Sequence, residues 1–203
     1  MSMRLTRVLI SAALVGLIGA GATALPAGQT TEAKKPAAAP AMPPGPKPGP
    51  EQAILKNDVG TWDATVEMVM GPPGTAPTVS KGVEINTLVG GMWLATNFKS
   101  TMMGQPFQGR GLAGYDSNKK KYVSTWVDTM STGLMLGEST YDAATKTMTG
   151  WMEGPDEAGK IVKSKAVSQS PDANTRVFTM YTTGPDGKEA PTLKITYKRR
   201  AQP

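Results

Sequence analysis

Turn-forming residues divide residues 61–200 into ten short runs that have the composition of β-strands. The turns are built from Gly, Pro, Asp and Asn, which accept positive φ or fix the φ of a turn position. Since no amphipathic helix of useful length separates two runs, parallel βαβ units are excluded and hairpins must join the strands. We expect strands at 61–70, 78–89, 92–101, 105–115, 121–130, 133–141, 146–153, 160–169, 175–183 and 191–200.

Apolar and polar residues alternate within these runs, as they do in a strand with one buried face. Trp62, Ala64 and Val66 share a face in the first run, and Leu193 and Ile195 share a face in the last. An open sheet of ten such strands leaves two exposed edges, which closure removes. The sequence therefore predicts an all-β fold, an antiparallel up-and-down β-barrel of about ten strands, with a short N-terminal helix over residues 51–58.

A closed barrel of this size has an interior that matters for function. About eight strands leave room for side chains or one small ligand, and ten strands enclose more. The interior is therefore expected either to hold a ligand or to be filled by side chains.

The N-terminal region has the pattern of a secretory signal peptide. Arg4 and Arg7 precede an apolar run over residues 8–25, and Ala22-Thr23-Ala24 forms a small-x-small cleavage sequence. The run is short and rich in Gly and Ala, unlike a transmembrane anchor. We expect a signal peptide over residues 1–24, export to the bacterial periplasm or the medium, and no transmembrane segment after cleavage.

The remaining chain divides into a linker and one domain. Prolines recur through residues 25–50, which predicts a Pro/Ala-rich disordered linker, and residues 51–203 are expected to form the barrel domain. The net charge of +6 lies mostly outside that domain, which contains 17 basic and 15 acidic residues. The basic pI is therefore no indication of nucleic-acid binding.

The composition excludes several kinds of active site. The chain has no histidine and no cysteine, so imidazole bases, Ser-His-Asp and Cys-His systems, haem and zinc sites with His ligands, thiolate sites and iron–sulfur clusters are all absent. We expect no cofactor and no metal. One alternative stays open, because the thioethers of methionines such as Met68, Met70, Met102 and Met103 are ligands for Cu(I). The simpler interpretation is that these residues are adaptable apolar filler.

Several segments resemble known families. Gly60-Thr61-Trp62 follows the expected helix and opens the first strand, which is the Gly-x-Trp placement of lipocalin-like (calycin) barrels. A more specific set resembles the bacterial family of unknown function numbered 1579. The segments that carry this resemblance are 90–94, 103–111, 114–116, 121–128, 132–135 and 137–142.

The resemblance covers nearly all of residues 51–200 and implies a lipocalin-like barrel, without an established activity, cofactor or catalytic residue. Lipocalin-like barrels often stack an arginine near the last strand on the tryptophan of the first strand. In this chain both Arg199 and Arg200 are candidates for that contact with Trp62.

We hypothesise that the barrel interior binds a small, largely apolar or amphipathic ligand. Polar groups at Arg110 and Asp128 would orient it, and an arginine favours a ligand that carries a carboxylate or a phosphate. The apolar contacts would come from Phe107, Tyr122, Trp126 and Met135.

Two other functions stay open, and the oligomeric state is undetermined. An isomerase or hydrolase would use Asp128, Glu138 or Tyr122, because carboxyl groups among apolar neighbours often serve as general acids or bases. In a two-carboxylate hydrolase, Asp128 and Glu138 would act as a pair. The simpler interpretation of Asp128 is that it ends a strand and accepts hydrogen bonds from turn amides near Thr132. A non-binding interaction module would have a filled interior.

Overall fold

The computed structural model describes residues 42, 44–71, 75–156, 159–184 and 187–201. The expected signal peptide, 1–24, lies outside the described residues, as does the expected linker apart from Met42 and residues 44–50. Within the described ranges, no helix is long and apolar enough to cross a membrane.

In this part of the chain, a short helical segment precedes ten strands. The helical segment consists of an α-helix, α1 (Pro50–Leu55), and a 3₁₀ turn, η1 (Lys56–Asp58). The strands are β1 (Gly60–Met68), β2 (Thr78–Val89), β3 (Trp93–Met102), β4 (Gln105–Asp116), β5 (Lys121–Asp128), β6 (Met135–Asp142), β7 (Thr147–Pro155), β8 (Ile161–Asp172), β9 (Thr175–Thr183) and β10 (Glu189–Arg199).

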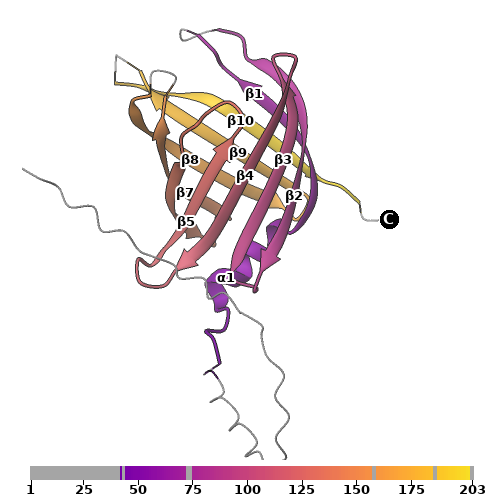
Figure 1. Cartoon of the computed structure of the whole chain (residues 1–203), viewed down its shortest axis with the longest axis vertical. Coiled ribbons are helices and arrows are strands. Elements are labelled where there is room, and N and C mark those ends of the chain that lie inside the picture. The colour runs from indigo at the N-terminus through magenta and orange to yellow at the C-terminus, as the bar shows by residue number, and fades with distance from the viewer. Residues whose placement is uncertain (1–41, 43, 72–74, 157–158, 185–186, 202–203) are drawn as a thin grey trace, which may run out of the picture. The chain divides into compact units, whose positions relative to one another are not determined.

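The strands form one closed antiparallel barrel (Figure 1). Closure occurs where β1 pairs with β10, with Trp62 opposite Arg199 and Met68 opposite Leu193. An even number of alternating strands makes the first and last antiparallel, so they can pair. The predicted all-β barrel is confirmed, and each predicted strand overlaps an observed one. The observed β8 continues past the predicted end because its register against β9 shifts between Gln169 and Asp172.

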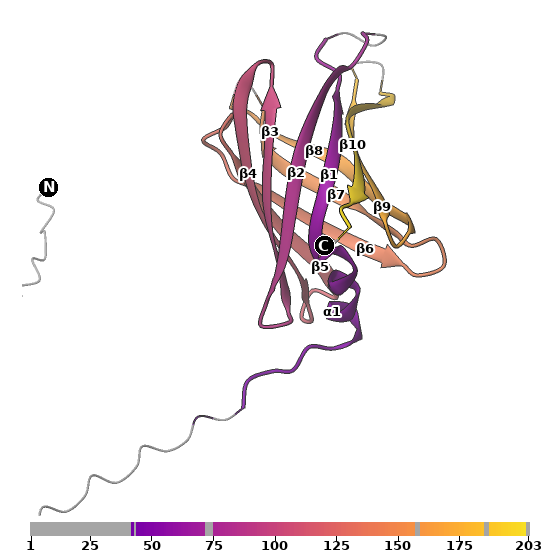
Figure 2. The ribbon, with the colours of Figure 1, turned by 90° about the vertical axis from the view of Figure 1, so that its right-hand side faces the viewer.

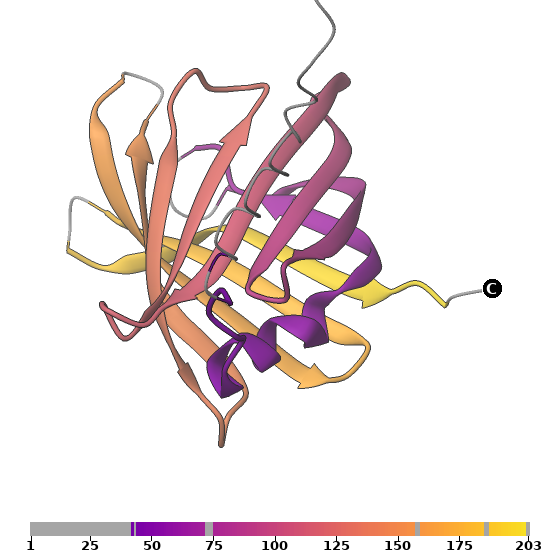
Figure 3. The same ribbon diagram turned by 60° about the horizontal axis from the view of Figure 1, so that its bottom comes forward.

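The helical segment lies across one end of the barrel, where β1 begins and β10 ends (Figures 2 and 3). Pro50 occupies the first turn of α1, where its missing N–H leaves no hydrogen bond unmade. The Gln52 side chain accepts a hydrogen bond from the backbone N–H of Gly49 at 2.8 Å. Leu55 is buried and packs with Leu94 and Tyr122. We call this the closed end, and the end with the β1–β2, β3–β4 and β5–β6 loops the open end.

The core follows the alternation of the sequence. Trp62, Ala64 and Val66 on β1 are each at most 2% exposed, so the predicted inner face of this strand is confirmed. They pack with Phe98 of β3 and Tyr197 of β10 in one cluster. Burial of these apolar side chains supplies most of the driving force that closes the barrel.

Candidate functional site

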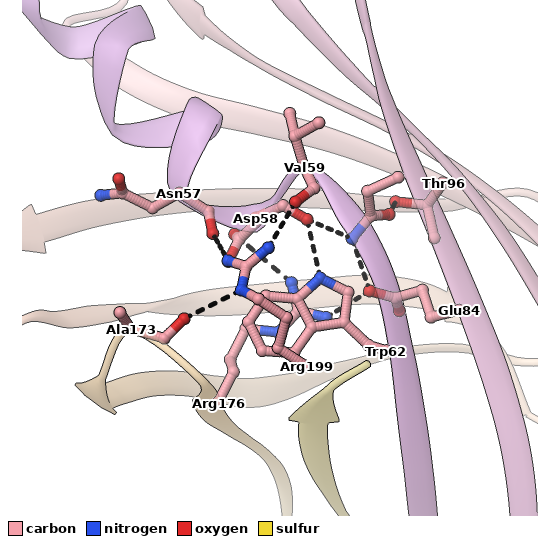
Figure 4. A network of polar contacts seen from close by, with 10 residues as sticks. Asn57, Asp58, Val59, Trp62, Glu84, Thr96, Ala173, Arg176 and Arg199 are labelled. Atoms are coloured by element: carbon pink, nitrogen blue, oxygen red, sulfur yellow. Dashed lines mark hydrogen bonds and ion pairs between the residues drawn. The ribbon is translucent and has the colours of Figure 1, made fainter. Parts of the chain in front are cut away.

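Polar contacts attach the helical segment to the closed end (Figure 4). The backbone carbonyl of Asp58 accepts hydrogen bonds from Nε1 of Trp62 at 2.9 Å and from Nδ2 of Asn86 at 3.0 Å. The Asn86 side chain also accepts a hydrogen bond from the Thr96 hydroxyl at 2.7 Å. The helical segment is therefore bonded to β1 and β2, and through Asn86 to β3.

Arg199 is the arginine that stacks on the first-strand tryptophan. Its guanidinium carbon lies 4.1 Å from the ring centre of Trp62. The same guanidinium donates to the backbone carbonyls of Val59, Asn57 and Ala173. Arg200 instead pairs with Asp63, and both of those side chains are half exposed.

A buried ion pair lies under this stack. Arg176 of β9 contacts Glu84 of β2 across the barrel and also lies 3.3 Å from Asp58. Burial disfavours the charge of Arg176, but the neighbouring carboxylates outweigh burial and raise its pKa above the ordinary value. Burial raises the pKa of the Tyr197 phenol, which lies beside the Arg176 guanidinium.

Sequence reasoning missed Arg176 and Glu84. The sequence did contain one signal for each residue. The alternation of β9 places Arg176 on the inner face of that strand, and the alternation of β2 does the same for Glu84. Within the described residues, no buried side-chain nitrogen or oxygen lacks a hydrogen-bond partner. The closed end is therefore a satisfied structural network rather than a set of polar groups that await a ligand.

The predicted interior residues separate into two groups. Phe107 is buried against Phe98, with ring centres 5.9 Å apart, and the Trp126 ring lies 6.4 Å from the same phenylalanine. Met135 is the cross-strand neighbour of Trp126. Tyr122 lies in the core of the closed end, where its hydroxyl donates to the Glu51 carbonyl at 3.0 Å.

Tyr122 has a structural environment. Burial raises its pKa to about 12, with a smaller contribution from the Glu51 carboxylate. The phenol is therefore neutral at physiological pH and serves to hold α1 on the barrel. This position does not suit a phenolate that acts as a general base.

The structure places Arg110 outside the barrel. Its side chain is exposed, and Phe107 and Gly109, on the other parity of β4, are buried. The register between β3 and β4 runs through Arg110 without a bulge, so successive residues alternate between faces. Arg110 therefore does not point into the interior with Phe107 and Trp126, and it is not an anchor for an interior ligand.

Asp128 makes two local hydrogen bonds. One carboxylate oxygen accepts from Nε1 of Trp126 at 2.9 Å, and the other accepts from the backbone N–H of Met130 at 2.9 Å. These contacts match the interpretation of Asp128 as a strand-ending residue, although the amide is that of Met130 rather than one near Thr132. The carboxylate also fixes the orientation of the Trp126 indole at the open end.

Glu138 lies on the outer face of the sheet. It is the cross-strand partner of Val123, whereas Ser124 and Trp126 point inward with Asp128. Its carboxylate contacts Lys119 at 2.7 Å and Lys121 at 2.9 Å. Hydrogen bonds from these two lysines lower the pKa of Glu138 to about 2. Because Asp128 and Glu138 lie on opposite faces, they do not form the two-carboxylate pair considered from the sequence.

The open end carries a pocket with a methionine-rich lining. Its volume is about 190 Å³. This volume is below the roughly 300–1,000 Å³ of sites for drug-sized molecules, so it suits a small ligand or one end of a longer ligand. The lining residues are Met102, Met103, Gln105, Pro106, Phe107, Thr129 and Met130.

Inward-facing side chains near β7 and β9 are less buried than those of β1. Met148 and Met152 on β7, and Phe178 and Met180 on β9, are only half-buried, although they alternate with outward-facing residues. We call these four residues the inner wall. Met148 packs against the cluster of Leu55, Leu94 and Tyr122, and Phe178 packs against the cluster that contains Trp62, so these strands complete the apolar lining of the barrel.

The fold is that of a lipocalin-like barrel. The chain belongs to the family described as "Protein of unknown function (DUF1579)", whose model matches residues 47–199. The resemblance drawn from the sequence is thereby confirmed. Among curated proteins, none matches the chain.

A solved structure shares the fold. The crystal structure of Rv2717c from M. tuberculosis matches with a TM-score of 0.56 and 11% identity, and it covers 75% of this chain and 99% of that chain. At this identity the likeness shows the fold alone. A redesigned β-barrel has a TM-score of 0.38 and 16% identity, covers 74% of this chain and 96% of that one, and supports no inference about this protein.

Proposed function

We propose that the barrel binds a small, largely apolar ligand at its open end. The observation that carries this proposal is the pocket of about 190 Å³, in which apolar side chains of β3, β4 and the β5–β6 loop line one space. Binding sites for small molecules are concave and mostly apolar, with few polar groups. Gln105 and Thr129 are the polar side chains of this lining.

The lining suits ligands of variable shape. Methionine is unbranched and polarisable, so Met102, Met103 and Met130 adapt to different apolar surfaces. Phe107 supplies a rigid aromatic surface beside them. Deeper in the barrel, the side chains of the inner wall are also apolar.

The ligand is encountered outside the cytoplasm in this proposal. The motivation is the signal-peptide pattern of residues 1–24, followed by the proline-rich residues 25–50. To test this part, cells are fractionated into cytoplasm, periplasm and medium, and the N-terminal residue of the mature protein is determined. We expect that residue to be Leu25. Full-length protein confined to the cytoplasm would contradict it.

Fluorescence titration with N-phenyl-1-naphthylamine, an uncharged apolar dye, tests binding. We expect saturable enhancement by the wild-type protein. Met103 and Met130 are 54% and 56% exposed, so Met103→Gln with Met130→Gln alters the lining without disturbing the core. We expect a rise in Kd of about tenfold, since roughly two methylene equivalents of apolar contact, about 0.8 kcal/mol each, are lost.

Leu134→Gln is the matched control. Leu134 is 51% exposed and belongs to the same loop region, but it does not line the pocket. We expect the Kd of this variant to equal that of the wild type. The absence of saturable binding, or an equal loss in the control and the pocket variant, would overturn the proposal.

A further inference from the structure

Five methionines surround a second, much smaller cavity at the open end. Its volume is about 20 Å³. A space of about 10–15 Å³ on this measure holds one water-sized group, so the cavity accepts a single ion or water rather than an organic molecule. The lining residues are Val66, Met68, Met70, Thr78, Ser80, Met102, Met103 and Met130. We call its five methionines the methionine cluster.

The methionine cluster is assembled from three separate parts of the chain. Met68 and Met70 lie at and after the end of β1, Met102 and Met103 lie at the β3–β4 turn, and Met130 follows β5. The closure of the barrel therefore brings the five side chains together. Apolar residues that only fill space would be expected to vary in type. Here the same residue type comes from three separate parts of the chain to surround one small cavity.

The exposure of three of the five methionines argues against a role in packing alone. Met70, Met103 and Met130 are 45%, 54% and 56% exposed, so they bury little surface in the core. A methionine that fills a core gap is expected to be buried. Leucine or a polar residue would serve equally well at an exposed loop position if only solubility or packing were at stake.

The backbone conformation at Met103 is a second, independent observation against a role in packing alone. Met103 and Gly104 form the two-residue turn between β3 and β4, with φ of 51° and 77°. A two-residue turn with positive φ at both positions favours Asn-Gly or Asp-Gly, and a long side chain at the first position is unfavourable. The turn therefore holds a thioether at a position for which methionine is a poor conformational choice.

We propose that the methionine cluster binds one soft monovalent metal ion of the Cu(I) class through thioether sulfur. Thioethers are soft, neutral ligands that select Cu(I), and the chain has no His or Cys to compete for it. The Asp128 carboxylate accepts a hydrogen bond from the backbone N–H of Met130 at 2.9 Å, which helps to fix the backbone of one of the five methionines. This proposal does not depend on binding of an apolar ligand in the larger pocket.

Anaerobic competition between the full-length protein and the coloured chelator bicinchoninate measures Cu(I) binding. We expect one Cu(I) per chain to be removed from the chelator. Met68→Leu combined with Met70→Leu keeps the volume and the apolar surface but removes two sulfurs from the small cavity, and neither residue lines the larger pocket. We expect this variant to bind Cu(I) at least about tenfold more weakly, and the dye N-phenyl-1-naphthylamine with unchanged Kd.

Met148→Leu combined with Met152→Leu is the control, because both residues lie on β7 and neither lines the small cavity. We expect this variant to bind Cu(I) as the wild type does. In protein with ¹³C-labelled methionine methyl groups, Ag(I) should shift resonances of the methionine cluster and leave those of Met148 and Met152 in place. No competition by the wild type, or equal weakening in both double variants, would overturn the metal site while leaving the apolar-ligand proposal intact.

Discussion

The guanidinium of Arg199 lies over the indole of Trp62, with 4.1 Å between the guanidinium carbon and the ring centre. The two residues are also opposite each other in the pairing of β10 with β1. Trp62 is only 2% exposed, and the Arg199 guanidinium covers one face of this buried ring. The stack therefore joins the last strand to the first at the point where the barrel closes.

Replacement of Arg199 by Ala should lower the free energy of unfolding by about 3 kcal/mol. The substitution removes a cation–π contact of roughly 1–2 kcal/mol and charged hydrogen bonds of similar size. Arg199→Lys should recover only part of it, because lysine lacks the planar fork that reaches several carbonyls. Urea denaturation measures both. Arg200→Ala is the control, because its exposed pair with Asp63 contributes little; equal losses at the two arginines would contradict the assignment.

Removal of the Glu84 carboxylate should be among the most damaging changes to the closed end. Glu84→Gln leaves the buried Arg176 with only Asp58 as a charged partner, and breaking a buried pair costs about 3–5 kcal/mol. Chemical denaturation of the variant measures this loss. Adding Arg176→Met should restore part of the stability, since the buried cation is removed and the Asp58 carboxylate that loses it is 28% exposed to solvent. Glu189→Gln removes an exposed partner of Lys165 and should change little; a Glu84 variant that behaved like this control would refute the prediction.

The strands could be predicted from the sequence because local signals determine them. Turn residues mark their ends, and the two-residue period from Trp62 to Val66 identifies the buried face of β1. The antiparallel order follows because no helix separates two strands. Arg199 could be predicted only as one of two candidates, since a choice between adjacent residues requires the register of β10 against β1.

The site residues were harder to predict because glycine conceals the face of a strand. Gly109 and Gly111 flank Arg110, so no side chain indicates which face each position occupies. Glycines within a strand are also typical of a β-bulge, which the regular register excludes here. Likewise, whether Asp128 and Glu138 share a face depends on the register across the β5–β6 loop, which the sequence alone does not determine. Alternation places Arg176 and Glu84 each on an inner face, but no local signal pairs these two residues, which lie 92 positions apart.

The Glu138 carboxylate should titrate far below an ordinary glutamate. Hydrogen bonds from Lys119 and Lys121 lower its pKa to about 2 from 4.5. A carboxyl whose folded-state pKa is depressed stabilises the fold above its unfolded pKa, and this stabilisation is lost as pH falls toward the folded value. The difference in unfolding free energy between wild type and Glu138→Gln should therefore be constant above about pH 4.5 and shrink between about pH 4.5 and 2. NMR titration of the side-chain carboxyl gives the midpoint directly, and a midpoint near 4.5 would show that the lysine contacts do not persist.

Gly109 is required because the Trp126 indole lies against its backbone. A Cβ atom at this position would lie 2.1 Å from Cζ2 of Trp126, a contact that forces the ring or the strand to move. Gly109→Ala should therefore destabilise the barrel by about 1–3 kcal/mol, as overpacking does, and should disturb the hydrogen bond from Trp126 to Asp128. Gly111→Ala is a graded control, because its Cβ would lie 3.1 Å from Cε3 of the same ring, and we expect a smaller loss.

A double-mutant cycle separates this clash from a general intolerance of alanine in β4. In the Trp126→Leu background the ring that meets the new Cβ is gone, so Gly109→Ala should cost much less than in the wild type. Thermal and urea unfolding of the four proteins give the coupling free energy. An unchanged cost of Gly109→Ala in the absence of the indole would mean that glycine is needed there for its backbone and not for the space that it leaves to Trp126.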